Sequence, residues 1–325
     1  MRIGVIGAGA WGTALAQVAA QTGEVVLWAR DPALAAAIAR DRENALYLPG
    51  IALSPRIETT AALADLARAD ALLVVTPAQH VRAVLSRTPV ATRPLLLCAK
   101  GIEAGTMALM SEAAAGACPD APIAVLSGPT FAAEVAAGLP TAVTLAATDP
   151  AVGQALAARL AVPAFRPYHS IDVVGAEIGG AVKNVLAIAC GVVEGAGLGR
   201  NARAALIARG FAEMTRFGLS RGAQAETLAG LSGLGDMVLT CSSEQSRNYT
   251  LGLGLGRGDS AAALLADRRT VAEGAFTAPV LVEAARAAGV EMPIAQAVAT
   301  LLAGAAGVRD VVDALLSRPI RSERI

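Results

Sequence analysis

A strand, a glycine turn and a helix follow one another at the start of this chain. Met1–Ile6 is rich in β-branched residues, the turn Gly7–Gly12 reads GAGAWG, and an alanine-rich helical pattern covers Thr13–Gln21. In such a unit the first glycine permits a tight turn, the second lets a ligand approach the backbone, and the third packs helix on strand. The helix start then offers N–H groups to a phosphate. The pattern predicts a dinucleotide-binding βαβ unit.

The next strand, Glu24–Trp28, ends at a pair of residues that could choose between two cofactors. Arg30 and Asp31 stand where the ribose-reading residue of such a unit belongs. Asp31 could accept from a free 2′-hydroxyl, as in NAD(H). Arg30, nearer the strand end, could pair with a 2′-phosphate or stack on adenine. We favour NADP(H), with NAD(H) as the alternative.

Strand and helix patterns alternate as far as about residue 170 and then only helical patterns follow. Further strands are expected at Ala71–Val75, Leu95–Cys98, Pro122–Leu126, Thr141–Ala147 and Ala164–Tyr168, with helices at Pro32–Arg42, near Ala61–Ala67, and at Pro150–Ala161. The expected helices beyond them are Val174–Val193, Asn201–Phe217, Ala223–Leu228, Asp236–Cys241, Ser260–Leu265, Ala278–Ala288, Pro293–Leu302 and Val308–Leu316. This switch predicts an α/β Rossmann-type domain over residues 1–173 and an all-α domain over residues 174–325.

Polar residues follow several of the predicted strands at the edge where open α/β sheets bind ligands. Thr76–Gln79 follows one strand, and Lys100 lies just beyond the next. Ser127–Thr130 ends another strand, and Thr130 is expected to cap a short helix over Phe131–Ala137. We therefore place Lys100 on the functional edge of the sheet.

On chemical grounds, we expect Lys183 to be the residue of this chain that exchanges a proton, because of where it lies and how few lysines there are. Among 27 basic residues only Lys100 and Lys183 are lysine, and Lys183 is the single charge in the apolar run Ile178–Val193. An amine in apolar surroundings can lose and regain a proton near neutral pH, whereas a guanidinium stays protonated. A lysine that only extends to water from a core helix is the alternative. The run is shorter than the roughly 20 residues that span a bilayer, so we expect a buried helix.

Composition excludes several other classes of protein. The chain has 325 residues, 54% of them hydrophobic, and its 27 basic and 27 acidic residues balance. No net charge recruits nucleic acid or an anionic membrane, so neither is an expected partner, and we expect no membrane insertion. The four cysteines form no C-x-x-C pair and only two histidines occur, so no metal site or disulfide framework is predicted. No secretory signal is apparent, and a cytoplasmic protein is expected.

Donors gather near the start of a helix-like segment in the second half of the chain. Ser246, Arg247 and Asn248 offer a hydroxyl, a guanidinium and an amide in succession. Such a combination at a helix start suits a phosphate, although a solvated surface turn would have the same composition. Two glycine-rich loops, Gly195–Asn201 and Ser232–Asp236, could equally be ordinary turns between helices.

Taken in order, these motifs closely resemble those of the bacterial-type NAD(P)+-dependent glycerol-3-phosphate dehydrogenases. The motifs that carry the resemblance are Gly7–Leu15 (GAGAWGTAL), Asn44–Gly50 (NALYLPG), Lys100–Glu103 (KGIE), Ser127–Pro140, Gly180–Asn184 (GAVKN), Asn201–Gly218, Leu234–Asp236, Thr240-Cys241 and Ser246–Asn248. They span nearly the whole chain. The family is similar to 6-phosphogluconate dehydrogenase in having a helical second domain, and it interconverts dihydroxyacetone phosphate and sn-glycerol 3-phosphate for phospholipid synthesis.

The resemblance implies a role for individual residues. Lys183 would be the proton acceptor at the C2 oxygen, and Lys100 would contact substrate and cofactor. The substrate-binding positions implied are Lys100, Gly128, Thr130, Lys183, Asp236, Ser246, Arg247 and Asn248. The cofactor-binding positions implied are Trp11, Arg30, Tyr47, Lys100, Ala132, Arg247, Val271 and Glu273, which join Gly7, Gly9, Ala10 and Gly12 of the turn. Ala10 stands where relatives often carry serine. The family also implies a homodimer.

Two other functions remain open on the sequence. A related β-hydroxyacid dehydrogenase would act on a carboxylate substrate, which arginine also binds. A regulator that senses NAD(P)H without turnover would give no reason to bury Lys183. Reduction of a ketone, in contrast, needs a hydride donor, a proton donor and an anchor for the phosphate, and the chain offers candidates for each.

Overall fold

The computed structural model describes residues 1–266 and 272–319 of the chain. These residues divide into two compact units: the first unit is Met1–Lys100 with Met110–Ala176, and the second unit is Gly101–Leu109 with Glu177 onward. The predicted boundary after residue 173 assigns Gly101–Leu109 to the first domain, whereas the contacts of this segment group it with the second unit. Local sequence patterns do not indicate such a segment, because its assignment depends on contacts with residues far away in the chain.

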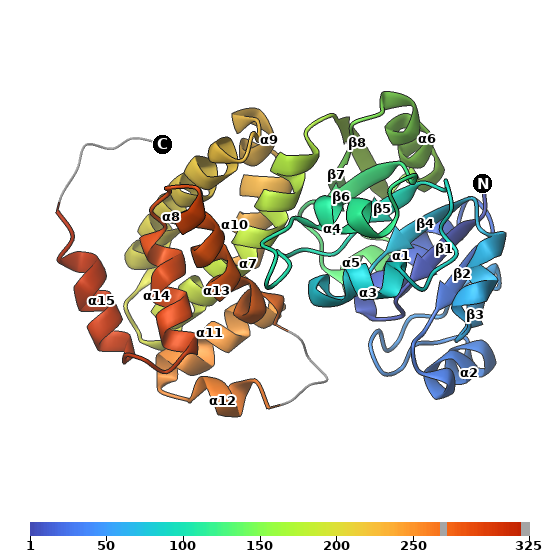
Figure 1. Cartoon of the computed structure of the whole chain (residues 1–325). Coiled ribbons are helices and arrows are strands. Elements are labelled where there is room, and N and C mark those ends of the chain that lie inside the picture. The colour runs from blue at the N-terminus through green and yellow to red at the C-terminus, as the bar shows by residue number, and fades with distance from the viewer. Residues whose placement is uncertain (267–271, 320–325) are drawn as a thin grey trace. The chain divides into compact units, whose positions relative to one another are not determined.

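The first unit is an eight-stranded sheet with helices packed against it (Figure 1). Its strands are β1 Ile3–Ile6, β2 Val25–Trp28, β3 Ile57–Thr60, β4 Ala71–Val74, β5 Leu95–Leu97, β6 Ile123–Ser127, β7 Thr141–Ala147 and β8 Phe165–Ser170. Its helices are α1 Ala10–Ala19, α2 Pro32–Asp41, α3 Val81–Leu85, α4 Met110–Ala117, α5 Ala132–Ala136 and α6 Pro150–Leu160, with 3₁₀ turns η1 Leu63–Arg68 and η2 Ala78–His80.

The order of the strands is that of a doubly wound dinucleotide-binding sheet. The order is β3-β2-β1-β4-β5-β6-β7-β8, and the strands from β3 to β6 are all parallel. β7 then runs antiparallel to β6, and β8 runs parallel to β7. The order reverses where β1 lies between β2 and β4, and ligands bind such sheets at that point, beyond the carboxyl ends of the strands. The predicted Rossmann-type fold is confirmed.

Alternate residues of the central strands pack into two different core clusters. In β4, Ala71 and Leu73 join one cluster, and Leu72 and Val74 join the other. Successive side chains of a strand point to opposite faces, so both faces of this sheet are covered. Burial on both faces explains why these strands read as continuous apolar runs, and why they could be recognised from the sequence.

One strand and two α-helices of the first unit were not predicted, and the 3₁₀ turn η2 lies where a loop was expected. The edge strand β3 has the sequence IETT with one buried residue, Ile57. Glu58 forms ion pairs, and the hydroxyls of Thr59 and Thr60 donate hydrogen bonds to neighbouring segments, so no apolar pattern marks the strand. α3 is a helix of five residues, too short to show a period. α4 lies in an alanine-rich stretch, where small residues blur the difference between the buried and exposed faces.

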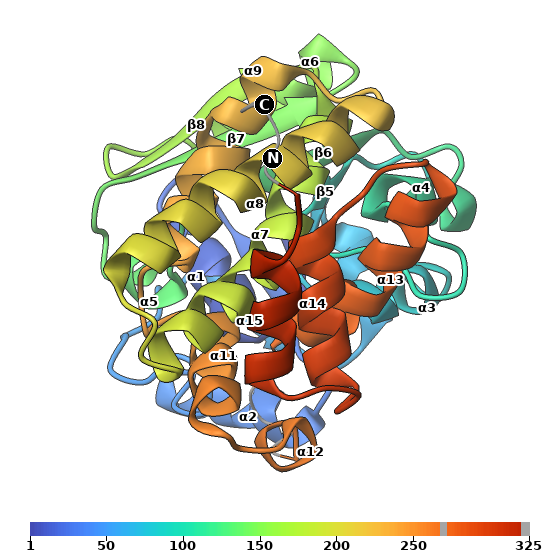
Figure 2. The same cartoon turned by 90° about the vertical axis from the view of Figure 1, so that its left-hand side faces the viewer.

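The described part of the second unit contains helices and no strand. They are α7 Val173–Gly195, which begins in the first unit, α8 Arg200–Ser220, α9 Ala225–Ala229, α10 Asp236–Thr240, α11 Arg247–Arg257, α12 Ala261–Leu264, α13 Glu273–Ala287, α14 Pro293–Leu302 and α15 Val308–Leu316, with a π-helical turn η3 Leu231–Gly235. α13, α14 and α15 lie side by side (Figure 2). The predicted helical second domain is confirmed.

Helix α7 is the buried centre of the second unit. It has 23 residues and is long and apolar enough to cross a membrane by length and composition alone. However, 89% of its most apolar 18-residue window is buried inside the protein. Such burial is typical of the core helix of a folded domain, and it is this helix that carries Lys183.

Candidate active site

The three glycines of the turn after β1 have different reasons to be glycine. Gly7 has φ +120°, and a Cβ there would lie 2.9 Å from the carbonyl oxygen of Val75. A Cβ on Gly12 would lie 1.8 Å from the carbonyl oxygen of Gly7. A Cβ on Gly9 would meet nothing within 4 Å. The fold itself therefore requires Gly7 and Gly12, and the open space at Gly9 fits a ligand that approaches the backbone.

The start of α1 is suited to an anion. Gly9 is its N-cap residue and provides no side-chain hydrogen bond, and no acidic residue stands in the first turn. The first N–H groups of a helix have no partner within the helix, and its dipole favours negative charge there. Trp11 is partly buried against the core cluster beside the turn. The residues present thus fit the pyrophosphate of a dinucleotide.

Arg30 and Asp31, which follow β2 closely, differ in their contacts. Asp31 is the N-cap of α2, and its carboxylate accepts the N–H of Ala33 at 2.8 Å. Arg30 is exposed and stands beyond the end of the strand. Asp31 thus uses one carboxylate oxygen to cap a helix, and the exposed Arg30 guanidinium stands beside it at the end of the strand.

The remaining cofactor candidates fall in both units. Tyr47 is 39% exposed in the loop between α2 and β3, and Ala132 is the first residue of α5. Arg247 and Glu273 are the first residues of α11 and α13 in the second unit. Val271 lies outside the described residues.

Lys100, Gly128 and Thr130 meet at one carbonyl group in the first unit. Lys100 Nζ donates to the carbonyl oxygen of Gly128 at 3.2 Å, and Thr130 Oγ1 donates to the same oxygen at 3.4 Å. The prediction that Thr130 caps α5 is wrong: Phe131 occupies the cap position, and no side chain makes the capping bond. The Thr130 hydroxyl turns back to Gly128 because this carbonyl lies just two residues away.

Lys183 is held by two buried oxygens in the second unit. Its Nζ donates to Oδ1 of Asp236 at 2.7 Å and to Oγ1 of Thr240 at 2.8 Å. Lys183 is 6% exposed and Asp236 is 0% exposed. Thr240 also donates to Oδ1 of Asp236 at 3.3 Å, which closes a triangle of hydrogen bonds. The ammonium and the carboxylate form a buried, charge-assisted pair with defined geometry.

Close backbone packing brings Asp236 to this lysine. Gly179 precedes Lys183 by one helical turn on the same face of α7. A Cβ there would lie 2.4 Å from the carbonyl oxygen of Ser232 and 2.8 Å from Gly233. The π-helical turn η3 therefore lies directly on α7, and α10 begins at its end with Asp236. Ser232–Asp236 is thus more than an ordinary turn, because it positions the partner of Lys183.

The phosphate candidates start α11, as predicted. Ser246 is the N-cap and its Oγ accepts the N–H of Tyr249 at 3.2 Å. Arg247 is exposed. Asn248 is buried, donates to Oδ1 of Asn184 at 3.0 Å and accepts the N–H of Gly274 at 2.9 Å. The Asn248 amide therefore joins α11 to α7 and α13. These bonds fix the helix start that carries Arg247, and they attach it to Asn184, the residue after Lys183.

Glycines also let α11 lie against α7. A Cβ on Gly191 of α7 would lie 2.1 Å from the carbonyl oxygen of Tyr249, and one on Gly252 of α11 would lie 2.1 Å from that of Ile188. Only glycine permits two helix backbones to approach this closely. The distance between Lys183 and the start of α11 is therefore set by the backbone.

Both halves of the chain match one family. Residues 2–153 match the description NAD-dependent glycerol-3-phosphate dehydrogenase N-terminus, and residues 172–313 match its C-terminus. The chain belongs to this family.

Similar proteins cover the chain from end to end. A glycerol-3-phosphate dehydrogenase (NAD(P)+) of Sphingopyxis alaskensis is 62% identical over 98% of this chain and 97% of its own length. One of Caulobacter vibrioides is 58% identical over 99% and 98%. The crystal structure of glycerol-3-phosphate dehydrogenase from Coxiella burnetii superposes with a TM-score of 0.93 at 37% identity, over 98% of this chain and 99% of that one.

Two residues of the site went unassigned in the sequence although both lie in motifs of the glycerol-3-phosphate dehydrogenase family. Thr240 completes the triangle at Lys183, and Asn184 holds Asn248. Thr240 follows Asp236 by four residues, which places both on one face of a helix, and that spacing could have revealed it. Asn184 directly follows Lys183 and had no such signal.

The thiol of Cys241, which follows Thr240 in the chain, is expected to be unreactive. A hydrogen bond with the Cys190 thiol is the larger cause, and burial the smaller, that raises the pKa of the Cys241 thiol well above its usual range. A protonated thiol is a weak nucleophile. Cys241 is therefore not a candidate nucleophile of this site.

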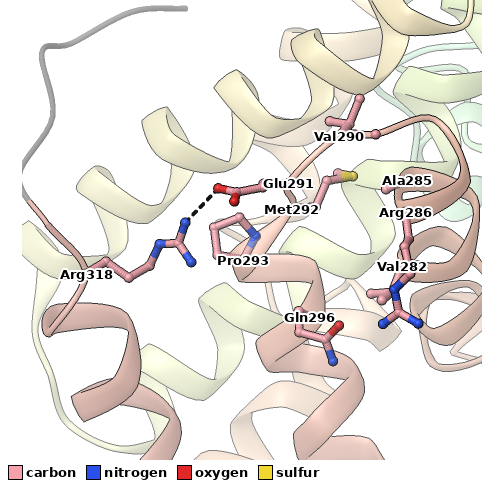
Figure 3. Close-up of a pocket in the computed structure, with 10 residues that line it drawn as sticks. Val282, Ala285, Arg286, Val290, Glu291, Met292, Pro293, Gln296 and Arg318 are labelled. Atoms are coloured by element: carbon pink, nitrogen blue, oxygen red, sulfur yellow. Dashed lines mark hydrogen bonds and ion pairs between the residues drawn. The ribbon is translucent and has the colours of Figure 1, made fainter.

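A hollow of about 350 Å³ lies elsewhere in the second unit and contains none of the predicted site residues. It is lined by the link between α13 and α14 and by Arg318 (Figure 3). Arg318 and Glu291 point toward one another there and form an ion pair of 3.0 Å. Because it contains neither Lys100 nor Lys183 nor Arg247, we do not assign the reaction to this hollow.

Proposed function

We propose that this member of the family interconverts dihydroxyacetone phosphate and sn-glycerol 3-phosphate, with Lys183 as the group that exchanges the proton. The observation that carries the proposal is the buried Lys183, held by Asp236 and Thr240. The cofactor is NADP(H) or NAD(H), which the family and its dinucleotide-binding fold imply. When bound, its nicotinamide ring supplies or takes the hydride.

Lys183 performs the acid–base step at the C2 oxygen of the substrate. During reduction of the ketone, the ammonium gives a proton to the oxygen on which negative charge develops. During oxidation of the alcohol, the amine takes the proton from the same oxygen. Asp236 and Thr240 hold Nζ in place through either direction, and they keep the long side chain from adopting other rotamers.

Lys100 is the second cation that we assign to the reaction. It is anchored to the Gly128 carbonyl in the first unit, and Thr130 donates to the same carbonyl. Its role is electrostatic, because a positive charge favours negative charge on a substrate oxygen. Gly128 and Thr130 are assigned to the substrate because they share this hydrogen-bonded group with Lys100.

The cofactor is assigned mainly to the open turn after β1. The N–H groups of Gly9, Ala10 and Trp11 would hold its pyrophosphate, and Arg30 would interact with its adenosine end. Tyr47 and Ala132 of the first unit, and Arg247 and Glu273 of the second unit, complete the proposed contacts. The bare space at Gly9 supports this assignment.

Ser246, Arg247 and Asn248 are assigned to the substrate phosphate. Arg247 is the exposed guanidinium of the three, and it stands at the start of α11, where helix N–H groups also favour an anion. A guanidinium can donate two parallel hydrogen bonds to one phosphate. Ser246 keeps its hydroxyl proton available while its oxygen caps the helix.

The product serves glycerophospholipid synthesis, in the cytoplasm, and the protein acts as a homodimer. The family resemblance supports these three assignments. Sedimentation of the purified chain tests the dimer, since a monomer across the micromolar range would contradict it.

The test of the activity is oxidation of NADPH, followed by its absorbance, with dihydroxyacetone phosphate as the substrate. We expect saturable turnover, and a Lys183→Arg variant that keeps the charge but loses at least about a hundredfold in kcat, because a guanidinium does not release its proton. Turnover of the variant within a few-fold of the parent would make Lys183 a positioning charge.

A panel of 2-oxo and 3-hydroxy acids serves as the control for substrate class. The phosphate ester should be turned over far faster than any carboxylate in the panel. Preference for a hydroxy acid would instead favour the related β-hydroxyacid dehydrogenase activity.

A further inference from the structure

Asn44 is a buried amide that no step of the proposed reaction uses. It is 0% exposed, in the loop between α2 and β3. Its Nδ2 donates to the carbonyl oxygen of Ala8 at 2.9 Å and to Oγ1 of Thr13 at 2.8 Å. Both protons of one amide group therefore reach the glycine turn and the first turn of α1, from a residue 36 positions away in the chain.

The bond to Ala8 fixes the direction of a neighbouring N–H group. A trans peptide is planar, so the carbonyl of Ala8 and the N–H of Gly9 point in opposite directions. Holding the Ala8 oxygen toward Asn44 aims the Gly9 N–H away from Asn44. Glycine at position 9 has the conformational freedom to let this peptide rotate, and the bond from Asn44 removes that freedom.

The other atoms of Asn44 shape the loop that carries Tyr47. Its Oδ1 accepts the N–H of Tyr47 at 3.3 Å. Its backbone oxygen accepts the N–H groups of Tyr47 at 3.2 Å and Leu48 at 2.8 Å. These bonds make a tight turn with Leu48 buried beneath it and Tyr47 partly exposed. One residue thus sets both the glycine turn and the loop.

We propose that Asn44 is a positioning residue for the dinucleotide: it orients the Ala8–Gly9 peptide and holds the Tyr47 loop to the same turn. The inference rests on the proposed cofactor site. Asn44 acts through Gly9 and Tyr47, because a fully buried side chain does not itself touch the cofactor. Its loss should weaken cofactor binding and leave the proton chemistry at Lys183 intact.

The experiment measures NADPH affinity, through the tryptophan fluorescence of the full chain, and steady-state kinetics of an Asn44→Ala variant. We expect the Kd and KM for NADPH to rise about tenfold, as for the loss of roughly 1.4 kcal/mol. The kcat at saturating NADPH and the KM for dihydroxyacetone phosphate should stay within about twofold of the parent, because uniform binding of one ligand is what is lost.

Gln17 provides a matched control. It links the same helix to the same loop, donating to the carbonyl of Ala52 at 3.3 Å and accepting the N–H of Ser54 at 2.9 Å, but it does not touch the glycine turn. Gln17→Ala should lower the thermal midpoint by an amount similar to Asn44→Ala. It should leave the NADPH affinity unchanged. Equal losses of affinity in the two variants would reduce Asn44 to a general tether of the loop.

Thr13 keeps the test decisive if Asn44→Ala folds poorly. Thr13→Val removes one of the two Nδ2 bonds with little change of shape, and Thr13→Ser retains it. We expect a several-fold rise of the NADPH Kd for valine and parental affinity for serine. If both behave like the parent, the bond between Asn44 and α1 does not position the turn, and the inference fails.

Gly9→Val separates this inference from the proposed function. Gly9 has φ −74°, which valine adopts, and a Cβ there has no protein atom within 4 Å, so the variant should fold but exclude the pyrophosphate. Loss of NADPH binding in Gly9→Val together with parental affinity in Asn44→Ala would refute only the role of Asn44. Parental affinity in Gly9→Val would refute the cofactor site itself.

Discussion

The glycine turn of the first unit and the Lys183 group of the second unit are built in contrasting ways. The turn offers backbone N–H groups around an empty space at Gly9, and the side chains near it hold the backbone. The Lys183 group consists of side chains that are buried and already satisfy one another. The contrast fits the proposed roles, in which the main chain of the turn binds a dinucleotide and a titrating side chain carries the proton.

Because of this difference, mutations in the two regions should affect different properties of the protein. A change at Gly9 should alter affinity with little effect on folding, because a Cβ there has no protein atom within 4 Å. A change in the Lys183 group should damage folding and turnover together, because the same hydrogen bonds serve both. The predictions below test whether that separation holds.

The largest effect is expected from Asp236→Ala, which leaves the Lys183 ammonium buried without its carboxylate. Breaking one side of a buried ion pair costs about 3–5 kcal/mol of unfolding free energy. Denaturant unfolding should show that loss, and kcat should fall at least about a hundredfold because Nζ loses the carboxylate that helps to hold it. Parental stability in this variant would mean that Asp236 is a purely catalytic partner.

A double variant sharpens this result. Lys183→Met with Asp236→Leu replaces the pair by apolar side chains of similar volume, which is often neutral or stabilising. We expect it to recover most of the stability lost in Asp236→Ala while showing no turnover. Failure to recover would indicate that the neighbouring oxygen of Thr240, rather than the ion pair, limits packing.

Glu213 provides a second buried carboxylate, bound to the backbone and without a lysine. It lies on α8 and accepts the N–H groups of Ile294 at 2.8 Å and Ala295 at 3.3 Å, at the start of α14. Burial raises the pKa of Glu213 to about 7, although these bonds and the charges of Arg216 and Arg318 act against the shift. Between about pH 4.5 and pH 7, the Glu213 carboxyl therefore keeps its proton in the folded state and releases it in the unfolded state.

Stability from Glu213 should fall as pH rises. Its folded pKa is about 7 against an ordinary value of 4.5, so its contribution is fully present below pH 4.5 and is lost by about pH 7. The difference amounts to something on the order of 3 kcal/mol. Denaturant unfolding of Glu213→Gln between pH 4.5 and 8 should lack this loss, and parallel pH profiles for parent and variant would contradict the assignment.

The general fold could be predicted from the sequence because its signals are local. The glycine turn lies next to the strand and helix that it joins, and the predicted bounds of β7, α14 and α15 agree with the structure. β3 was missed because an edge strand with one buried residue lacks an apolar pattern. Local sequence also indicated that Lys183 would lie in a buried helix.

The partners within the site could not be predicted in this way. Asp236 is 53 positions from Lys183, and their contact depends on glycines that let η3 lie on α7. Asn44 reaches Ala8 across 36 positions for a comparable reason. Such contacts follow from the packing of whole helices, and residue patterns within one helix do not record them.

A smaller effect is expected from Arg247→Ala, which tests the exposed cation of the second unit. Loss of charged hydrogen bonds to the substrate phosphate should cost roughly 2–3 kcal/mol, which raises KM for dihydroxyacetone phosphate on the order of 30- to 150-fold. Because Arg247 is exposed, its removal should leave the unfolding free energy nearly unchanged.

Phosphate-free dihydroxyacetone is the control for Arg247. It should be a poor substrate of the parent, and the mutation should affect it far less. Measuring kcat/KM for both ketones in both proteins closes a double-difference cycle that isolates the phosphate contribution. Equal proportional losses would assign Arg247 to the cofactor or the fold.

The smallest effect is expected from Arg30→Ala, the exposed cation of the first unit. If its guanidinium pairs with the 2′-phosphate, NADPH should lose roughly 1–3 kcal/mol of binding free energy while NADH loses little. Asp31→Ser is the matched variant, because serine also caps helices and keeps the bond to the N–H of Ala33. It should change neither affinity. If Arg30→Ala weakens both cofactors equally, Arg30 stacks on adenine, and if Asp31→Ser selectively weakens NADH, the carboxylate that caps α2 also reads the ribose. Either result would show that side chains, and not only the main chain, select the ligand of the first unit.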